Sequence, residues 1–299
     1  MRPLLLFPAL ATALFLAGCA PADEAASGGG SSATTSASAG DSASPTETAE
    51  ACAKDALKTR KPGTLTVGTD KPAYEPWFVD DDPTNGKGYE SAVAYAVAEE
   101  LGFAKNEVTW TVASFNQAIS PAPKTFDVDI NQVSITPARA KNVDFSSGYY
   151  DVAQSVVTIK GSKAENAKSL ADLKKVKLGA QVGTTSYTAA KDTIAPSQKV
   201  AVYNTNDDAK AALANGQIDA LVVDLPTGLF LAAADLENGK LVGQVPTSGT
   251  PEQFGMVLDK GSALTPCVSK AVDALRTDGT LKKLEEQWLT STAGAPVLS

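Results

Sequence analysis

The sequence contains the same strand, loop and helix order twice, and this repetition limits the fold more than any other feature. In the first stretch, alternating apolar residues predict strands and a helix in the order 64–69, 89–101 (helix), 108–112 and 126–133. In the second stretch, the predicted order is 177–181, a helix from about 186, 200–203, 207–213 (helix) and 218–223. The chain is therefore expected to form two α/β units.

The N-terminal 50 residues are expected to lie outside the folded body. Arg2 followed by an apolar run from Leu4 to Ala17 is typical of a signal peptide, since the run is too short to span a bilayer. The run ends in Leu-Ala-Gly-Cys19, which resembles the lipobox of bacterial lipoproteins, so lipidation of Cys19 is expected, with an ordinary secretory signal as the alternative. Residues 20–50 contain no aromatic or branched aliphatic side chain and are expected to form a disordered tether.

Two further cysteines, Cys52 and Cys267, form an even pair in a chain that is expected to be exported. A disulfide between them is favoured, and two free thiols are the alternative. The bond would join the start of the folded part to the C-terminal part, where a strand at 254–258 and helices at 265–276 and 281–289 are predicted. The chain would then return to the lobe in which it began.

Composition excludes several classes of function. The 26 Lys and Arg residues are outnumbered by 34 Asp and Glu residues, so nucleic acid is not an expected partner. The chain has no histidine, which rules out Ser/His/Asp and Cys/His catalysis and every metal site built on histidine. No metal, no cofactor and no enzyme activity are expected.

The segment from Ser134 to Tyr150 carries the most specific motif. It reads Ser-Ile-Thr-Pro-Ala-Arg-Ala-Lys-Asn-Val-Asp-Phe-Ser-Ser-Gly-Tyr-Tyr and resembles the Ile-Thr-Pro-Glu-Arg-Ala, Val-Asp-Phe-Ser and Tyr-Tyr signature of the family 3 bacterial solute-binding proteins. Thr277 to Trp288 is similar to the closing Asp-Gly-Thr and Trp motif of the same family. The resemblance covers about residues 60–292.

The resemblance implies the type II periplasmic-binding-protein fold, two α/β lobes joined by two hinge crossings near 151–158 and 244–255. The domain boundaries that follow from it are 1–19 for the signal peptide, 20–50 for the tether, 51–152 for lobe 1, 153–248 for lobe 2, and 249–299 for the return to lobe 1 with the C-terminal helices.

Arg139 is the central candidate for ligand binding. A guanidinium matches a carboxylate with two parallel hydrogen bonds, although a surface ion pair with Asp144 would equally account for a lone arginine. In the family the corresponding arginine holds the α-carboxylate of an amino acid, and Asp224 corresponds to the partner of the α-ammonium. From the residues alone, Asp224 could instead cap the helix that follows it. The full set that the resemblance implies is Asp70, Tyr74, Gln132, Ser134, Arg139, Thr185 and Asp224.

The identity of the side chain that is bound is expected to depend on residues near these loops. The selectivity candidates are Trp77, Glu75, Asn131 and Gln181, with Trp77 more a wall of the site than a contact. Gln132 replaces the Gly or Ser common in the family, so it is expected to contact the ligand through its backbone and to narrow the pocket. Acids outnumber the single arginine in these loops, which favours a polar-neutral or cationic ligand side chain.

The resemblance implies a monomeric, extracytoplasmic lipoprotein that is anchored to the cell membrane through Cys19. It would capture an amino acid by closing its cleft and deliver it to the membrane permease of an ABC importer. Two alternatives remain: a periplasmic dehydratase on the same fold, with Glu75 or Glu90 as general acid, and a lipoprotein that presents its ligand to a sensor.

Overall fold

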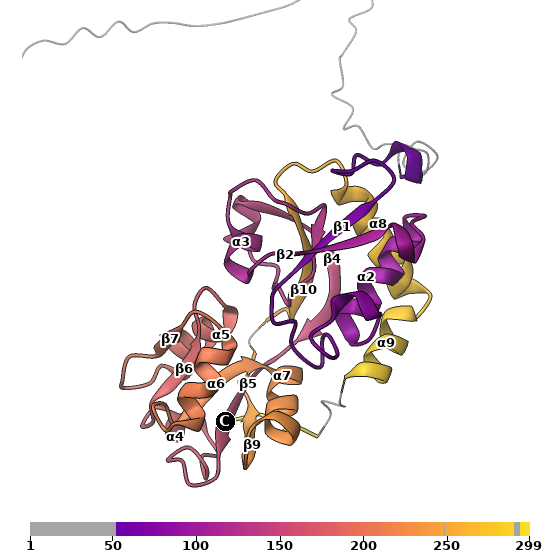
Figure 1. Ribbon diagram of the computed structural model, residues 1–299. Helices are drawn as coiled ribbons and strands as arrows, with labels where there is room; N and C mark the ends of the chain where they lie inside the picture. The colour runs from indigo at the N-terminus through magenta and orange to yellow at the C-terminus, as the bar shows by residue number, and fades with distance from the viewer. Residues whose placement is uncertain (1–51, 248, 290–293) are drawn as a thin grey trace, which may run out of the picture. The chain divides into compact units, whose positions relative to one another are not determined.

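The computed structural model of the protein describes residues 52–247, 249–289 and 294–299, and its strands form two five-stranded sheets (Figure 1). The two α/β lobes that were expected are built on these sheets. The signal peptide expected at 1–19, the lipidation of Cys19 and the tether expected at 20–50 lie outside the described residues.

The first sheet has the strand order β2-β1-β3-β10-β4. Its first three strands are parallel, and β10 runs antiparallel to both β3 and β4. The strands are β1 (Leu65–Thr69), β2 (Val108–Val112), β3 (Val128–Asp129), β4 (Val143–Val152) and β10 (Glu252–Asp259). The helices of this lobe are α2 (Tyr89–Glu100), α3 (Phe115–Ile119), α8 (Thr265–Thr277) and α9 (Thr280–Trp288).

The second sheet repeats this plan in the order β7-β6-β8-β5-β9. Here β7, β6 and β8 are parallel, and β5 runs antiparallel to β8 and β9. The strands are β5 (Gln154–Ile159), β6 (Leu178–Gln181), β7 (Ala201–Tyr203), β8 (Ala220–Asp224) and β9 (Gly239–Gln244). The helices are α4 (Leu170–Leu173), α5 (Thr185–Thr188), α6 (Asn206–Ala214) and α7 (Leu225–Phe230). Thr205 caps α6, which therefore begins at Asn206, one residue before the helix that was expected at 207–213.

Short helical segments complete the chain. Two π-helical segments, η5 (Ala189–Ile194) and η6 (Leu231–Asp235), continue α5 and α7. The others are single 3₁₀ turns: η1 (Lys54–Ala56), η2 (Pro83–Asn85), η3 (Lys105–Glu107) and η4 (Arg139–Lys141). Within the described ranges, no helix combines the length and the apolar character that crossing a membrane would need.

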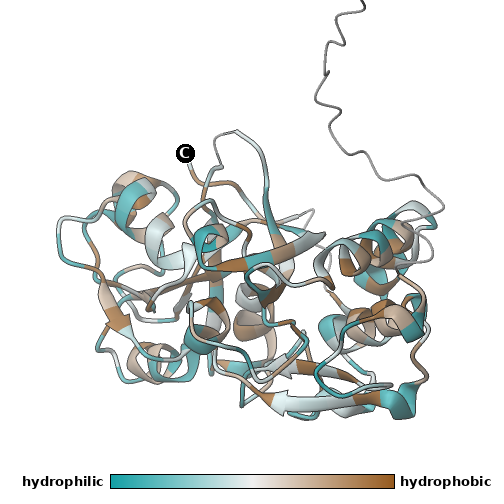
Figure 2. Ribbon diagram, turned by 90° about the horizontal axis from the view of Figure 1, so that it is seen from above, coloured by the Kyte–Doolittle hydropathy of each residue, from teal (hydrophilic) through white to brown (hydrophobic). Residues whose placement is uncertain are grey.

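Apolar side chains are buried on both faces of each sheet, and Figure 2 shows the hydrophobic stretches on strands and helices of both lobes. The largest core of the first lobe contains Trp77, Tyr89 and Phe254, all with at most 1% of their surface exposed. The disulfide between Cys52 and Cys267 joins the start of the described chain to α8, with a Cα–Cα distance of 5.3 Å, and this confirms the expected pairing.

The chain crosses between the lobes in two short steps close to the expected places. Only Ala153 separates β4 from β5, and the second crossing lies between Gln244 and Glu252. The segment expected to be only a crossing is thus the junction of two long strands. As a result, the first residues of β5 and β10, Gln154 and Glu252, lie at the two crossings.

The last residues differ from the expectation that all of 249–299 belongs to the first lobe. The backbone N–H of Gln244 donates to Pro296 O at 2.7 Å, and Leu298 N–H donates to Gln244 O at 2.9 Å. Leu298 is 3% exposed in a core of the second lobe, so 294–299 belong there. The physical reason is that β9 is an edge strand, whose unpaired backbone groups accept another strand.

Candidate ligand-binding site

A cavity lies at the carboxyl ends of β1 and β3 of the first lobe and of β6 and β8 of the second, where ligands of open α/β sheets bind. All seven residues predicted as ligand contacts line it: Asp70, Tyr74, Gln132, Ser134, Arg139, Thr185 and Asp224. Two of the selectivity candidates, Asn131 and Gln181, line it as well.

Arg139 lines the cavity and is 8% exposed. Its Nη1 donates to Ser134 O at 2.6 Å, its Nη2 donates to Gly183 O at 2.9 Å, and its guanidinium carbon lies 5.2 Å from the ring centre of Phe115. Burial lowers the pKa of Arg139, and the charges of Glu252 and Asp224 oppose that shift. The guanidinium has five N–H donors, so donors remain for a ligand after these two bonds.

The alternative of a surface ion pair between Arg139 and Asp144 is wrong. Asp144 Oδ1 instead accepts from Lys260 Nζ at 2.9 Å. Among the described residues, no carboxylate oxygen lies within 4.0 Å of a nitrogen of Arg139. The arginine therefore faces the cavity without a partner of opposite charge in direct contact.

Ser134 and Thr185 come from different lobes and meet across the cavity. Their hydroxyl oxygens are 3.2 Å apart. Thr185 Oγ1 donates to Glu252 Oε1 at 2.6 Å, and Ser134 Oγ donates to the same oxygen. Thr184 caps α5 by accepting from Tyr187 N–H, which fixes Thr185 as the first residue of the helix. The predicted pair of hydroxyls is thus brought together.

Asp224 ends β8 and faces the cavity. Its Oδ1 accepts from Gln154 Nε2 at 2.8 Å. It stands at the N-cap position of α7, but its side chain makes no capping hydrogen bond, so the capping interpretation is wrong. Burial, together with the nearby charge of Glu252, raises the pKa of Asp224 to about 8. A cation in the cavity would stabilise its ionised form.

Gln132 adopts a left-handed backbone conformation with φ of 48°. That conformation is easy for glycine, which the resemblance places here in relatives, and uncommon for glutamine. The backbone N–H of Gln132 donates to Glu90 Oε1 at 2.8 Å, and its side chain and Tyr149 Oη also donate to the Glu90 carboxylate. Burial raises the pKa of Glu90 to about 7, against the lowering effect of these hydrogen bonds.

Asp70 and Tyr74 lie on the loop after β1. The two oxygens of Asp70 accept from Lys71 N–H at 2.8 Å and from Phe115 N–H at 3.3 Å. Burial raises the pKa of Asp70 despite these bonds. The loop therefore presents a fixed carboxylate next to an aromatic ring.

Two selectivity candidates do not line this cavity. Trp77 is fully buried, packs edge-on against Tyr150 and Phe254, and donates from Nε1 to Thr227 Oγ1 of the second lobe at 2.9 Å. Glu75 lines a neighbouring cavity. The backbone of Gly88 lies close to that of Trp77, since a Cβ atom at Gly88 would lie 2.5 Å from Trp77 O.

The carboxyl groups proposed for a dehydratase are also not at this cavity. Glu75 faces the neighbouring cavity, and Glu90 is completely buried and bound by Gln132 and Tyr149. Neither lies among the lining residues with Arg139.

Sequence reasoning missed several residues of the site. The unpredicted lining residues are Phe115, Thr184, Ser186, Asn206 and Val223. Ser114 and Gln117 form a capping box at the start of α3, a signal that could have placed Phe115 at a helix start. Glu252 and Gln154 carried no such signal, because each acts from a crossing between the lobes.

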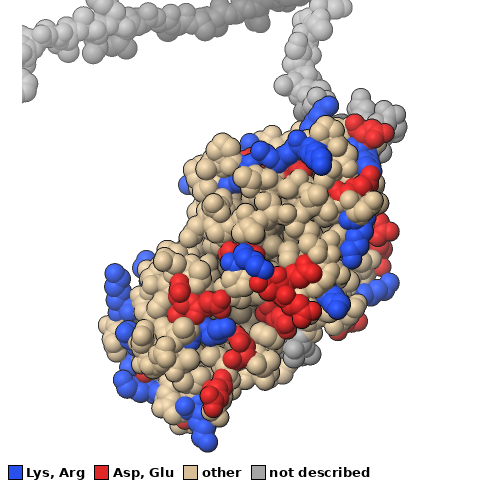
Figure 3. Space-filling model, in the orientation of Figure 1, with Lys and Arg blue, Asp and Glu red and all other residues tan. Residues whose placement is uncertain are grey.

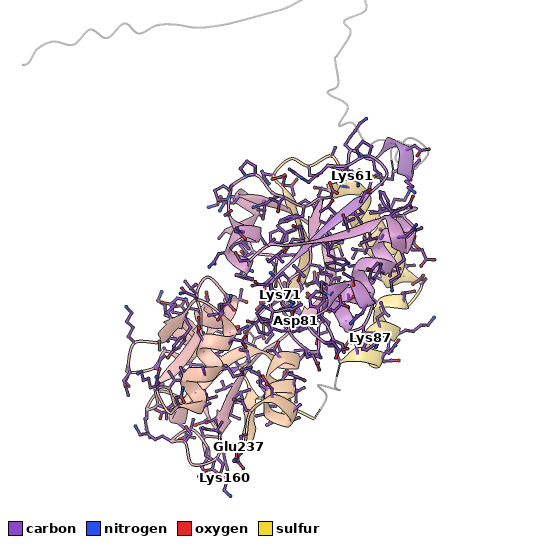
Figure 4. The ribbon with its side chains drawn as sticks, in the orientation of Figure 1. Lys61, Lys71, Asp81, Lys87, Lys160 and Glu237 are labelled. Carbon is purple, nitrogen blue, oxygen red and sulfur yellow. A yellow bond between two sulfur atoms is a disulfide. The ribbon has the colours of Figure 1, made fainter. Side chains whose placement is uncertain are left out.

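Acidic side chains gather on the face shown in Figure 3, where the two lobes meet. Asp81, labelled in Figure 4, lies in this region and pairs with Lys71 at 2.5 Å. The neighbouring cavity is lined by three further acids and one lysine: Glu75, Asp207, Asp235 and Lys210. The surroundings of the site are therefore rich in negative charge.

Comparison with known proteins agrees with this fold. Residues 65–291 match the model of the bacterial extracellular solute-binding proteins, family 3. The protein belongs to this family of extracytoplasmic binding proteins.

Individual relatives are similar over most of their length. The L-arginine-binding protein of Pseudomonas aeruginosa is 29% identical over 241 residues, which are 75% of this chain and 90% of that protein. The probable histidine-binding protein of Campylobacter jejuni is 31% identical over 224 residues, 72% of this chain and 81% of that protein. A solved structure of an ancestral arginine-binding protein bound to glutamine has a TM-score of 0.63 and 33% identity, covering 76% of this chain and 98% of that one.

Proposed function

We propose that this protein captures an amino acid in the cavity between its lobes and delivers it to the permease of an ABC importer. The observation that carries the proposal is the division of the binding groups: Ser134 and Arg139 come from the first lobe, and Thr185 and Asp224 come from the second. Each lobe alone offers only part of the coordination of an amino-acid zwitterion. Closure therefore gains contacts that an open form lacks.

Each end of the zwitterion has a matching group. The α-carboxylate binds Arg139 with the hydroxyls of Ser134 and Thr185, and the α-ammonium binds Asp224. The ligand side chain then extends toward Asp70, Tyr74 and Asn131. The lining contains two carboxylates and one arginine, and further acids lie around it, so a cationic or polar-neutral side chain is favoured over an acidic one. Relatives named for arginine and histidine binding support this charge preference.

The delivery role also requires a place at the membrane. We propose that the mature protein is a monomeric lipoprotein that is held to the cell membrane by lipid on Cys19 and does not turn over its ligand. Replacing Cys19 by alanine should move the protein from the membrane fraction to the soluble extracytoplasmic fraction. Retention of the Cys19→Ala protein on the membrane would contradict the anchor.

A thermal-shift screen of the twenty amino acids and common amines tests the function. Binding to the native state alone raises the melting temperature, by an amount that corresponds to about 2.7 kcal/mol at one hundred times the Kd. Arginine, lysine, histidine and glutamine should raise it, and aspartate and glutamate should not. A screen in which no amino acid has any effect would overturn the proposal.

A further inference from the structure

The carboxylate of Glu252 lies among the groups that the proposed function assigns to the ligand's α-carboxylate. Its Oε1 accepts from Thr185 Oγ1 at 2.6 Å and from Ser134 Oγ. One hydroxyl belongs to each lobe, so this single carboxylate oxygen links the two walls of the cavity.

Glu252 also lies at the junction of the two crossings. It is the first residue of β10, where it pairs with Val152, the last residue of β4. Gln154, the first residue of β5, points its Nε2 at Glu252 Oε1 over 3.3 Å and donates to Asp224 at 2.8 Å. Ser186 holds Gln154 in this position by donating to its Oε1 at 2.6 Å. A polar network therefore runs from the hinge strands to both ends of the site.

The surroundings of Glu252 favour an anion. Ser134, Thr185 and Gln154 all present donors to it, and the guanidinium of Arg139 lies close enough to interact with its charge. A ligand carboxylate would need the same hydroxyls and the same positive field. Two carboxylates that share one set of donors repel each other.

We propose that Glu252 acts as an internal substitute for the ligand's carboxylate. Its carboxylate draws Ser134 and Thr185 together and closes the cleft of the ligand-free protein, and it is displaced when a ligand carboxylate binds. The side chain has a way out, because it is partly exposed and follows the exposed residues Gly249 to Pro251. This competition lowers the affinity for the ligand, whereas the contacts of Glu252 with both lobes raise the population of the closed state.

The closing action does not depend on the proposed function and is tested without ligand. Lys61 and Lys160 are exposed and lie at the far ends of the first and second lobes (Figure 4). Dyes are placed on Lys61→Cys and Lys160→Cys in the full chain with Cys19→Ser; the disulfide occupies the remaining two of the three cysteines. Energy transfer between the dyes then reports the separation of the lobes.

Glu252→Ala and Glu252→Gln should both lower energy transfer in the ligand-free protein, with alanine having the larger effect. Glu237 is an exposed glutamate of the second lobe, and Glu237→Gln is the matched control that should leave the energy transfer unchanged. Glutamine keeps the size of the side chain, so a folded Glu252→Gln protein with unchanged energy transfer would overturn the closing role even if the alanine variant failed to fold.

The competition between Glu252 and the ligand's carboxylate rests on the proposed function, and it is tested with L-arginine as the probe. Calorimetry should find that Glu252→Ala binds L-arginine about tenfold more tightly, the equivalent of one hydrogen bond to a charged group. Weaker binding would show that Glu252 contacts the ligand and would overturn the competition. If neither the native protein nor any variant binds an amino acid, the proposed function fails, and the energy-transfer result still decides the closing role.

Discussion

Arg139 Nη2 lies 2.9 Å from the carbonyl oxygen of Gly183, so a side chain of the first lobe donates directly to the backbone of the second. The same guanidinium is the proposed partner of the ligand's carboxylate. If Arg139 binds the ligand as proposed, binding and closure both depend on one planar group, and a change in its shape should affect both.

Replacing Arg139 by lysine should weaken amino-acid binding by about 2–3 kcal/mol, although the charge is kept. An ammonium cannot place two parallel donors on a carboxylate, and each charge-assisted hydrogen bond contributes about 1.5–3 kcal/mol. Calorimetry measures the loss. Arg60→Lys is the matched control, because Arg60 makes an exposed ion pair with Asp259 at 3.8 Å. Unchanged affinity of Arg139→Lys would remove Arg139 from the site.

Replacing Asp224 by asparagine should weaken binding by roughly 2 kcal/mol or more and leave the ligand-free melting temperature equal or higher at neutral pH. The change removes the charge of the proposed partner of the α-ammonium. The change removes no capping hydrogen bond from α7, since the Asp224 side chain makes none. Both quantities are measured on the same purified variant. A lower melting temperature with native affinity would instead make Asp224 a structural residue.

The ligand-free protein should lose stability as the pH rises from about 4 to about 8. The pKa of Asp224 is raised from 3.8 to about 8 in the folded state, so the folded state binds the proton more tightly than the unfolded state does. Stability is therefore greatest below the unfolded pKa and is lost as the pH rises through the folded pKa. Melting temperatures at pH 5 and pH 8 measure the change.

Asp224→Asn should flatten this pH dependence without abolishing it. Glu90, whose pKa is raised to about 7, contributes a loss of the same sign. A variant with the full native dependence would show that Asp224 is ionised in the folded protein at pH 5.

Reducing the disulfide should destabilise the folded domain by as much as about 5 kcal/mol, the loop-closure value for 215 residues. Denaturant unfolding of native protein against a Cys52→Ser, Cys267→Ser double variant measures the loss. Intact-mass analysis after alkylation should find neither cysteine labelled before reduction. Rapid labelling of both under denaturing, non-reducing conditions would contradict the bond.

Trp77→Phe should weaken binding of every amino acid by a similar factor and leave their order of affinity unchanged. Phenylalanine keeps the aromatic packing on Tyr150 and Phe254 and loses only the bond to Thr227 across the lobes. Trp110→Phe is the control, since its Nε1 bonds to Tyr95 within the first lobe. A changed order of affinities would return Trp77 to the set of selectivity residues.

Local patterns predicted the regular elements well where apolar periodicity was strong. The helix expected at 89–101 is α2 (Tyr89–Glu100), and the strand expected at 108–112 is β2. The long strands β4 and β5 were not distinguished from a crossing, because an extended hinge and a strand have the same alternation. Their pairing with β10, β8 and β9 comes from distant parts of the chain.

The site was predictable where a loop follows a strand, since the fold brings such loops together without long-range detail. Ser134, Thr185 and Asp224 are of this kind. Glu252 and Trp77 were not, because their roles depend on side-chain direction at a crossing and in an aromatic cluster. The backbone carbonyls that bind Arg139 carry no sequence signal at all.

The C-terminal residues 294–299 add to β9 after α9 has packed on the first lobe, so the chain passes between the lobes a third time. Two short crossings, at Ala153 and between Gln244 and Glu252, act as a hinge about which the two lobes can rotate. A chain that is held on both lobes limits how far they can separate, so we expect the pairing of residues 296–298 with Gln244 of β9 to restrict the opening of the cleft. Truncating the chain before residue 294 should therefore let the two lobes open further. A reporter fused after Ser299 would move with the second lobe.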